Sequence, residues 1–297
     1  MEVAWKLERE QPGGTAGIGE IRTMKHVATA LCLGLLMAAP APAQAEESPA
    51  ERAERWVDLK HAVFGERPVQ EGTGVIALDA PARAQDAALV PITISLSAGG
   101  GSGGGRVKAV WVLVDGNPSP LAGTFKFGPA ADPRTLRTRV RVDQYTLMHA
   151  VAETEDGRLF SAERFVKAAG GCSAPSLKDP QLAMSRLGQM RLRVEGEGPL
   201  QDGEASSAQL LVSHPNNNGM QVDQVSHNFI PPRYIQDITV RYGDQVVLTV
   251  DADISLSEDP AITFGFVPHG AGPFRVEVQD STRAVFKQEF PAVGGRS

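Results

Sequence analysis

The sequence predicts an all-β protein in which a short N-terminal helix precedes two antiparallel β-sandwiches, with a flexible, cysteine-bearing linker between them. Three features indicate this fold: short segments that alternate between apolar and polar residues, turn-forming residues between these segments, and a glycine-rich interruption past the middle of the chain. Short strands spaced in this way are typical of β-sandwiches. The length of 297 residues suits one large or two ordinary domains.

The composition is that of a globular protein in water. Hydrophobic residues make up 42% of the chain and charged residues 22%. The formal net charge is −6, and no block of basic residues is present. Because nucleic-acid binding depends on clustered Lys and Arg that contact phosphates, this composition argues against a nucleic-acid partner.

The N-terminal region has the pattern of a secretory signal peptide. A basic start at Met24-Lys25-His26 precedes the mostly apolar residues 27–37, and Ala43-Gln44-Ala45 forms a small-residue cleavage site. The apolar run is too short to span a bilayer, so we expect no membrane anchor. The alternative interpretation is a buried N-terminal helix. Cleavage would remove residues 1–45.

Residues 46–64 are predicted to form a helix. Ser48 is suited to cap its N-terminus, and Pro49 to occupy its first position. Trp56, Leu59 and Val63 recur at helical spacing, so we expect them to pack on the strands that follow.

From residue 74 onward the apolar period changes to two, which is the period of a strand with one buried face. The strand-like segments of the first half are residues 75–78, 88–96, 107–114, 124–127, 135–142, 147–153 and 160–166. Those of the second half are residues 190–195, 208–213, 234–240, 245–252, 262–267, 274–278 and 285–290. We interpret the glycine-rich residues 99–105 as a loop, because the Lys-Ser/Thr of a phosphate-binding loop does not follow them. The predicted domains are residues 46–167 and 186–297, with the linker at 168–185.

The linker contains Cys172, which is the only cysteine left once Cys32 is removed with the signal peptide. Its neighbours Gly170, Gly171 and Ser173 have little side-chain bulk, so we expect a flexible arm on which the thiol is exposed. An exposed thiol is partly ionised near neutral pH and can act as a nucleophile or as a point of covalent attachment. The alternatives are a buried, inert cysteine and a disulfide between two copies of the chain.

Several short motifs, in a specific order, resemble the sulfur carrier family SoxY. They are Val90-Pro91-Ile92, Val114-Asp115-Gly116-Asn117-Pro118-Ser119-Pro120-Leu121, Val140-Arg141-Val142, Asp156-Gly157-Arg158-Leu159-Phe160 and Val166-Lys167-Ala168-Ala169-Gly170-Gly171-Cys172. The second half is similar to the partner family SoxZ, through His214-Pro215, Gly219-Met220-Gln221, Ile230-Pro231, Ser257-Glu258-Asp259-Pro260 and Phe264-Gly265-Phe266. The chain as a whole resembles the fused SoxYZ-like carriers found beside quinoprotein dehydrogenases.

This resemblance implies that both halves are immunoglobulin-like sandwiches. It also implies a periplasmic carrier, in which Cys172 holds sulfur intermediates covalently and presents them to Sox enzymes. In the family the cysteine lies on a terminal Gly-Gly-Cys-Gly-Gly arm. Here Ser173-Ala174 replaces the last two glycines and the chain continues, so the arm is attached at both ends.

Other residue patterns add no catalytic, metal or cofactor site to these expectations. The histidines at positions 61, 149, 214, 227 and 269 lack the spacing of metal ligands, and no nucleophile-base arrangement is visible. Asp251 and Asp253 share one strand face, as do Arg139 and Arg141. The arginines could attract an anionic sulfur species, although we expect them to be surface residues.

We therefore expect a non-enzymatic carrier without a cofactor that binds inorganic sulfur species. Its expected protein partners are periplasmic Sox-type enzymes or c-type cytochromes, with a quinoprotein dehydrogenase as a further candidate. The alternative function is an accessory binding protein of a quinoprotein dehydrogenase or its cytochrome, in which the thiol carries no sulfur.

Export should leave Glu46 as the first residue, because cleavage is expected after Ala45. N-terminal sequencing of the exported protein measures this directly. A mature chain that retains Cys32 would contradict both the signal peptide and the single-thiol expectation.

Overall fold

The computed structural model describes residues 47–97, 105–175, 180–196 and 199–292. These residues belong to one compact unit. The predicted signal peptide at residues 1–45 and most of the glycine-rich loop at 99–105 lie outside the described residues. Within the described ranges, no helix is both long and apolar enough to cross a membrane.

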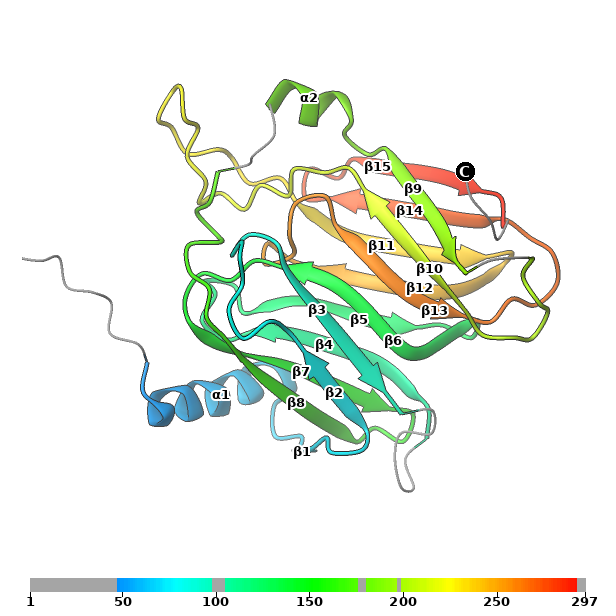
Figure 1. The fold of residues 1–297 in the computed structure, drawn as a ribbon, viewed down its shortest axis with the longest axis horizontal. Coiled ribbons are helices and arrows are strands. Elements are labelled where there is room, and N and C mark those ends of the chain that lie inside the picture. Colours follow the sequence, from blue (N-terminus) through cyan, green and yellow to red (C-terminus); the bar gives the residue numbers. More distant parts are fainter. Residues whose placement is uncertain (1–46, 98–104, 176–179, 197–198, 293–297) are drawn as a thin grey trace, which may run out of the picture. The chain divides into compact units, whose positions relative to one another are not determined.

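The described part of the chain consists mainly of β-strands (Figure 1). The first half contains α1 (Pro49–Phe64), β1 (Val69–Glu71), β2 (Ile76–Asp79), β3 (Val90–Leu96), β4 (Val107–Val114), β5 (Leu121–Phe127), β6 (Ala131–Val140), β7 (Thr146–Thr154) and β8 (Leu159–Val166). The second half contains α2 (Pro180–Ser185), β9 (Met190–Glu195), β10 (Ser206–Val212), β11 (Ile235–Tyr242), β12 (Gln245–Ala252), β13 (Ala261–Phe266), β14 (Phe274–Asp280) and β15 (Val285–Phe290). The all-β class and the short N-terminal helix are confirmed.

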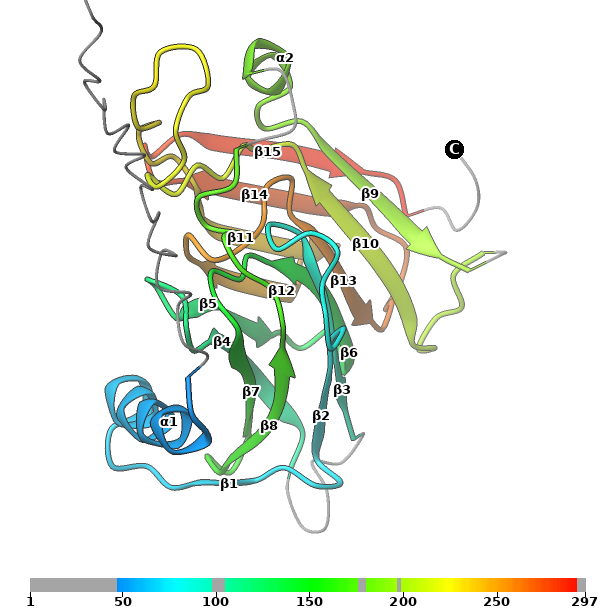
Figure 2. The same cartoon turned by 60° about the vertical axis from the view of Figure 1, so that its left-hand side comes forward.

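The strands form two sheets that pack face to face (Figure 2). Among the described residues, one sheet has nine strands in the order β1-β8-β7-β4-β5-β12-β11-β14-β15. The other has six, in the order β2-β3-β6-β13-β10-β9. Strand β1 runs parallel to β8, whereas the junction strands β5 and β12 are antiparallel, as are β6 and β13.

The two halves of the chain share both sheets. Strand β5 pairs with β12, so that Phe125 lies opposite Val250. In the second sheet β6 pairs with β13, and Leu136 lies opposite Phe264. Each sheet of the first sandwich therefore continues into a sheet of the second, and four strands that would otherwise be open edges are paired. The boundaries at 167 and 186 stay predictions.

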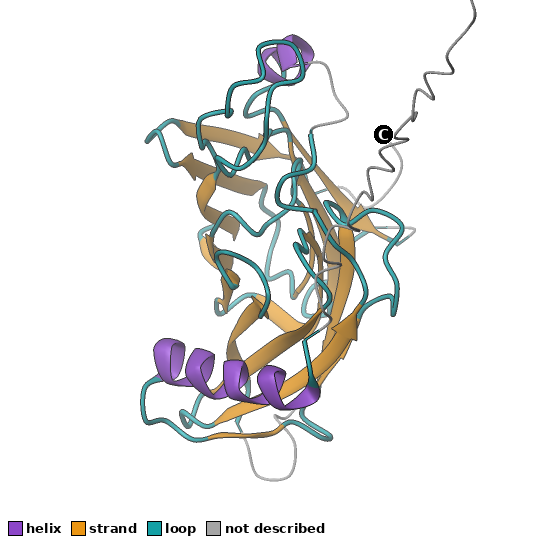
Figure 3. Cartoon of the chain, turned by 90° about the vertical axis from the view of Figure 1, so that its left-hand side faces the viewer, coloured by secondary structure: helices purple, strands orange, loops and turns teal. Residues whose placement is uncertain are grey.

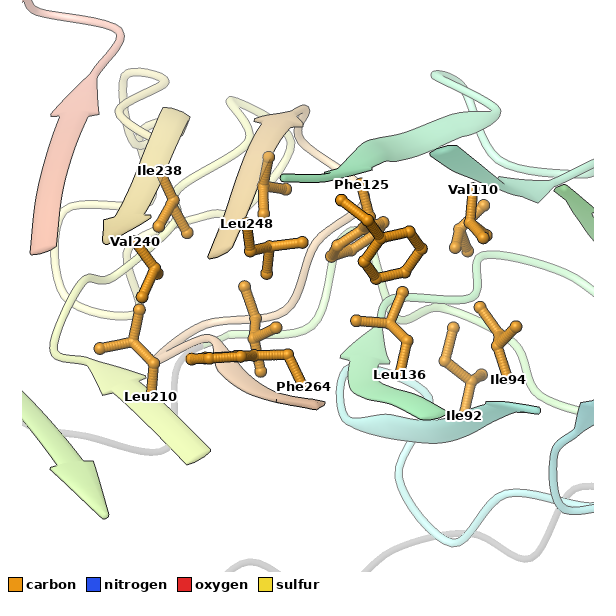
Figure 4. Close-up of a cluster of buried hydrophobic side chains, with 14 of the residues drawn as sticks. Ile92, Ile94, Val110, Phe125, Leu136, Leu210, Ile238, Val240, Leu248 and Phe264 are labelled. Atoms are coloured by element: carbon orange, nitrogen blue, oxygen red, sulfur yellow. The ribbon is translucent and has the colours of Figure 1, made fainter. Parts of the chain in front are cut away.

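One hydrophobic core lies between the sheets and extends through both halves (Figure 4). The alternation along the strands explains it: in β3 the side chains of Val90, Ile92, Ile94 and Leu96 are buried while those between them are more exposed. Figure 4 shows residues of the second half, among them Leu248, in the same cluster as residues of the first.

Helix α1 covers the outer face of the nine-stranded sheet (Figure 3). Its N-terminus is a capping box, in which the Ser48 hydroxyl accepts a hydrogen bond from the Glu51 backbone and the Glu51 carboxylate accepts one from the Ser48 backbone. The ring of Trp56 stacks on that of His149, with centroids 3.6 Å apart. Phe64 packs in a separate small cluster with Leu113, Val151 and Leu159.

Because the halves share sheets and core, we expect them to unfold together. Leu210→Ala removes a fully buried side chain of β10 and should lower the free energy of unfolding by about 2–5 kcal/mol. Both Trp56 and Trp111 lie in the first half, so tryptophan fluorescence and circular dichroism in a urea titration should shift by the same amount.

The matched control is Leu211→Ala, the same change at the neighbouring, half-buried position of β10. This variant should lose much less stability. A Leu210→Ala protein whose tryptophan transition stays at the wild-type urea concentration would show that the halves unfold independently.

Candidate functional site

The segment that carries Cys172, residues 167–175, continues directly from β8 and is held by backbone hydrogen bonds. It is called the cysteine segment below. The Gly170 amide donates to the Asp143 carbonyl at 2.7 Å, and the Gly171 amide donates to the Val142 carbonyl at 2.9 Å. Before them, Lys167 donates to the carbonyl of Ala82. The segment is therefore anchored to the first sandwich on the N-terminal side of the cysteine.

The two glycines serve different structural needs here. Gly170 has a φ of +78°, a conformation that residues with a side chain rarely adopt. Gly171 lies so close to the chain that a Cβ atom would sit 2.1 Å from the carbonyl oxygen of Ala87. The flexible arm expected from these glycines is not what the structure shows, because they permit close packing of backbone against backbone.

Cys172 is buried, with 3% of its surface exposed. Its carbonyl oxygen accepts a hydrogen bond of 2.7 Å from the side-chain amide of Asn218, which belongs to the second half of the chain. Asn218 is itself held by Gln221, whose side-chain oxygen accepts from the Asn218 backbone amide. The prediction of an exposed thiol is therefore wrong for this conformation. The neighbouring residue Ser173 is exposed.

The surroundings of Cys172 disfavour its thiolate. Burial raises the pKa of the thiol to about 12, the Asp143 carboxylate adds to the increase, and the Arg141 guanidinium opposes it. The thiol is thus protonated at neutral pH, and only the thiolate is an effective nucleophile. In this conformation the Cys172 thiol is therefore a poor nucleophile.

Arg141 is the second notable residue of the site. Its side chain is 1% exposed, so the expectation of a surface arginine is wrong, whereas Arg139 is half-buried and donates to the Asp259 carbonyl. Arg141 follows β6, whose last residue is Val140, and its side chain turns toward the cysteine segment. There it donates to the Gly171 carbonyl at 3.4 Å and to the Asn216 carbonyl at 3.2 Å.

A cavity of about 370 Å³ opens beside the segment. Three of its lining residues, Gly170, Ala174 and Pro175, flank the cysteine on both sides, and Arg141 lines it as well. Carboxylates of Asp86 and Glu258 also line this cavity. A buried cation and a cavity thus lie beside the backbone that flanks the cysteine, an arrangement that sequence periodicity cannot reveal.

The other residues considered from the sequence do not form a second site. His149 bridges two carboxylates, with Nδ1 at 3.0 Å from Asp115 and Nε2 at 3.1 Å from Glu163. Asp251 pairs with Lys126 on the surface. In the part of the chain that the structure describes, no group of three or more His, Cys, Asp or Glu could hold a metal ion.

Comparison with known proteins assigns each half to a family. Residues 60–172 match the family described as sulfur oxidation protein SoxY, and residues 195–291 match sulphur oxidation protein SoxZ. Among solved structures, the chain is similar to the sulfur carrier protein SoxY from Chlorobium limicola f thiosulfatophilum. The two are 29% identical over 40% of this chain and 96% of that chain, with a TM-score of 0.33. None of the curated proteins matches the chain.

These matches cover both halves in the order expected from the sequence motifs, and the first of them ends at Cys172. The chain belongs to the SoxY and SoxZ families of sulfur oxidation proteins, as a SoxYZ fusion within one polypeptide.

Proposed function

We propose that this protein is a periplasmic sulfur carrier that holds sulfur intermediates covalently on Cys172 and presents them to partner enzymes without catalysing a reaction itself. The observation that carries the proposal is the position of Cys172: it is the last residue of the SoxY match and follows Gly170-Gly171. With the signal peptide removed, it is also the only thiol available.

The conformation in which Cys172 is buried is called the closed position. To carry sulfur, the cysteine segment must leave this position, because the buried thiol is neither accessible nor ionised. Three short hydrogen bonds, each below 3 Å, hold the closed position in addition to the long one from Arg141: Gly170 to Asp143, Gly171 to Val142, and Asn218 to Cys172. At about 1 kcal/mol net for each bond, the segment would be open in roughly one chain in a hundred. A partner that binds only the open form can capture this small population, because binding shifts the equilibrium toward the open form.

In the open form Cys172 can be loaded by exchange. Its thiolate attacks a sulfur atom of a donor that contains a sulfur–sulfur bond, and a new bond forms between the two sulfurs. The donor's own sulfur–sulfur bond breaks, and its leaving sulfur departs with the electron pair. The donor is the oxidant in this step, and the proton of the thiol goes to solvent.

The partners we propose are periplasmic Sox-type enzymes, with c-type cytochromes and a quinoprotein dehydrogenase as further candidates. A partner must accept a cysteine that is attached at both ends, because the described chain resumes with α2 and β9 after the segment. The active-site entrance of such a partner must therefore be wide enough for a loop.

Protein purified from its own host should carry sulfur-containing adducts on Cys172 that a reductant removes. Intact-mass measurement detects them as added sulfur or sulfonate masses. Cys172→Ser should fold and lack every adduct, because only the thiol can form one. An unmodified thiol in protein taken from cells that are oxidising sulfur compounds would refute the carrier function.

Opening of the segment should control how fast Cys172 reacts. In the native protein at pH 8, alkylation should be at least roughly a hundredfold slower than in denaturant, since few chains are open and a thiol of raised pKa holds little thiolate. Gly171→Ala should accelerate native alkylation at least tenfold, because its Cβ would collide with the Ala87 carbonyl and prevent closure.

The matched control is Gly105→Ala, which also introduces a Cβ at a glycine without a positive φ, but where the new atom would make only an ordinary van der Waals contact with Glu155 at 3.5 Å. This variant should alkylate at the wild-type rate. Fast native alkylation of the wild-type protein at pH 8 would show that the closed segment is not its main state.

The closed position should also become less stable as the pH rises from the ordinary thiol pKa of 9.0 toward 12, because the buried thiol is stable only while protonated.

A further inference from the structure

Arg141 is a buried cation that forms no direct ion pair with any residue that the structure describes. Its side chain is the largest of those that are fully buried. A buried charge is costly unless a partner of opposite charge or good hydrogen bonds compensate it. The desolvation is large enough to lower the pKa of this guanidinium.

The hydrogen bonds of Arg141 leave much of its donor capacity unused. A guanidinium has five N–H donors. Here one Nη donates to the Gly171 carbonyl at 3.4 Å and the other to the Asn216 carbonyl at 3.2 Å, and both bonds are long. The Nε atom is buried and has no hydrogen-bond partner. Planar, forked donors of this kind match the oxygens of carboxylate, phosphate or sulfonate groups.

The guanidinium of Arg141 contacts the backbone of the segment that carries the proposed carrier thiol. The Nη1 atom contacts the carbonyl of Gly171, the residue directly before Cys172. Arg141 also lines the cavity beside the segment, together with Gly170 and Ala174. An adduct that extends from Cys172 by a few atoms therefore has both space and a cation within reach.

Three carboxylates act against an anion in this region, and their positions limit the charge it can have. Asp86 is exposed and Glu258 is half-buried at the cavity, while Asp143 lies near the thiol. Water screens the exposed charges much more than it screens buried Arg141. The balance favours an anion of a single charge that directly contacts the guanidinium over a free, multiply charged one.

We propose that Arg141 is the residue that recognises the charged end of the carried group: its guanidinium binds the terminal oxygens of a sulfonate-ended adduct on Cys172. This inference rests on the proposed carrier function and names the residue that holds the loaded sulfur. The anion supplies the partner that the buried guanidinium lacks, and the loaded segment is retained in its closed position.

The test compares a charged and an uncharged adduct installed chemically on the purified, full-length mature protein. Tetrathionate supplies the charged one: the Cys172 thiolate attacks a central sulfur, the central sulfur–sulfur bond breaks, thiosulfate leaves with the electron pair, and a Cys–S–S–SO₃⁻ adduct remains. Methyl methanethiosulfonate supplies the uncharged one: the thiolate attacks its methylthio sulfur, methanesulfinate leaves, and Cys–S–S–CH₃ remains. Both loadings can be carried out during unfolding and refolding.

Removal of each adduct by dithiothreitol is followed by intact mass, and each native rate is divided by the rate in denaturant to correct for intrinsic reactivity. In the wild-type protein we expect the sulfonate-ended adduct to be protected at least tenfold more than the methylthio adduct. Arg141→Gln should reduce this ratio to about one. Arg139→Gln is the matched control, the same change at the neighbouring arginine, and should keep the wild-type ratio.

Arg141→Lys covers the case in which the glutamine variant does not fold, because it keeps the charge but loses the forked donors. It should lower the ratio at least threefold. Equal protection of both adducts in the wild type, or a wild-type ratio in Arg141→Gln or Arg141→Lys, would overturn the proposal. Since the adducts are installed chemically, the result does not depend on whether the host loads Cys172, so failure of the carrier function and failure of the anion site are distinguishable.

Discussion

The pairing of β5 with β12 and of β6 with β13 is the constraint on which the rest of the structure depends. Through these two ladders the sheets and the hydrophobic core extend from one half of the chain to the other. They fix the loop after β10 against the end of the first half, so that Asn218 reaches the carbonyl of Cys172. The closed position of the cysteine is thus a product of both halves, and neither could form it alone.

The sequence was sufficient to predict the structural features that depend on the pattern of neighbouring residues. Alternating apolar residues predicted most strands, and Ser48 with Pro49 predicted the start of α1, because burial and capping leave signatures within a few residues. The family motifs predicted the SoxY and SoxZ halves, which the comparisons confirm. The short elements β1 and α2 were not predicted, since three and six residues are too few to show a period.

The sequence was enough to propose Cys172 as the candidate site, but not to predict whether its thiol is exposed or buried. Small neighbours made Cys172 a candidate, yet the same lack of bulk permits either exposure or close packing. What decides is contact with the Ala87 carbonyl and with Asn218, which are distant in sequence. The burial of Arg141 escaped prediction for the same reason: the strand alternation that groups it with Arg139 no longer applies beyond Val140, where β6 ends.

Burial of Cys172 also has a consequence for the chemical lifetime of the protein. Oxidation of cysteine to sulfenic acid proceeds through the thiolate, and the next step to sulfinic acid is irreversible for most proteins. A thiol that remains protonated and covered by its own backbone enters this sequence of oxidations slowly. The closed position of the segment therefore protects the Cys172 thiol from irreversible oxidation.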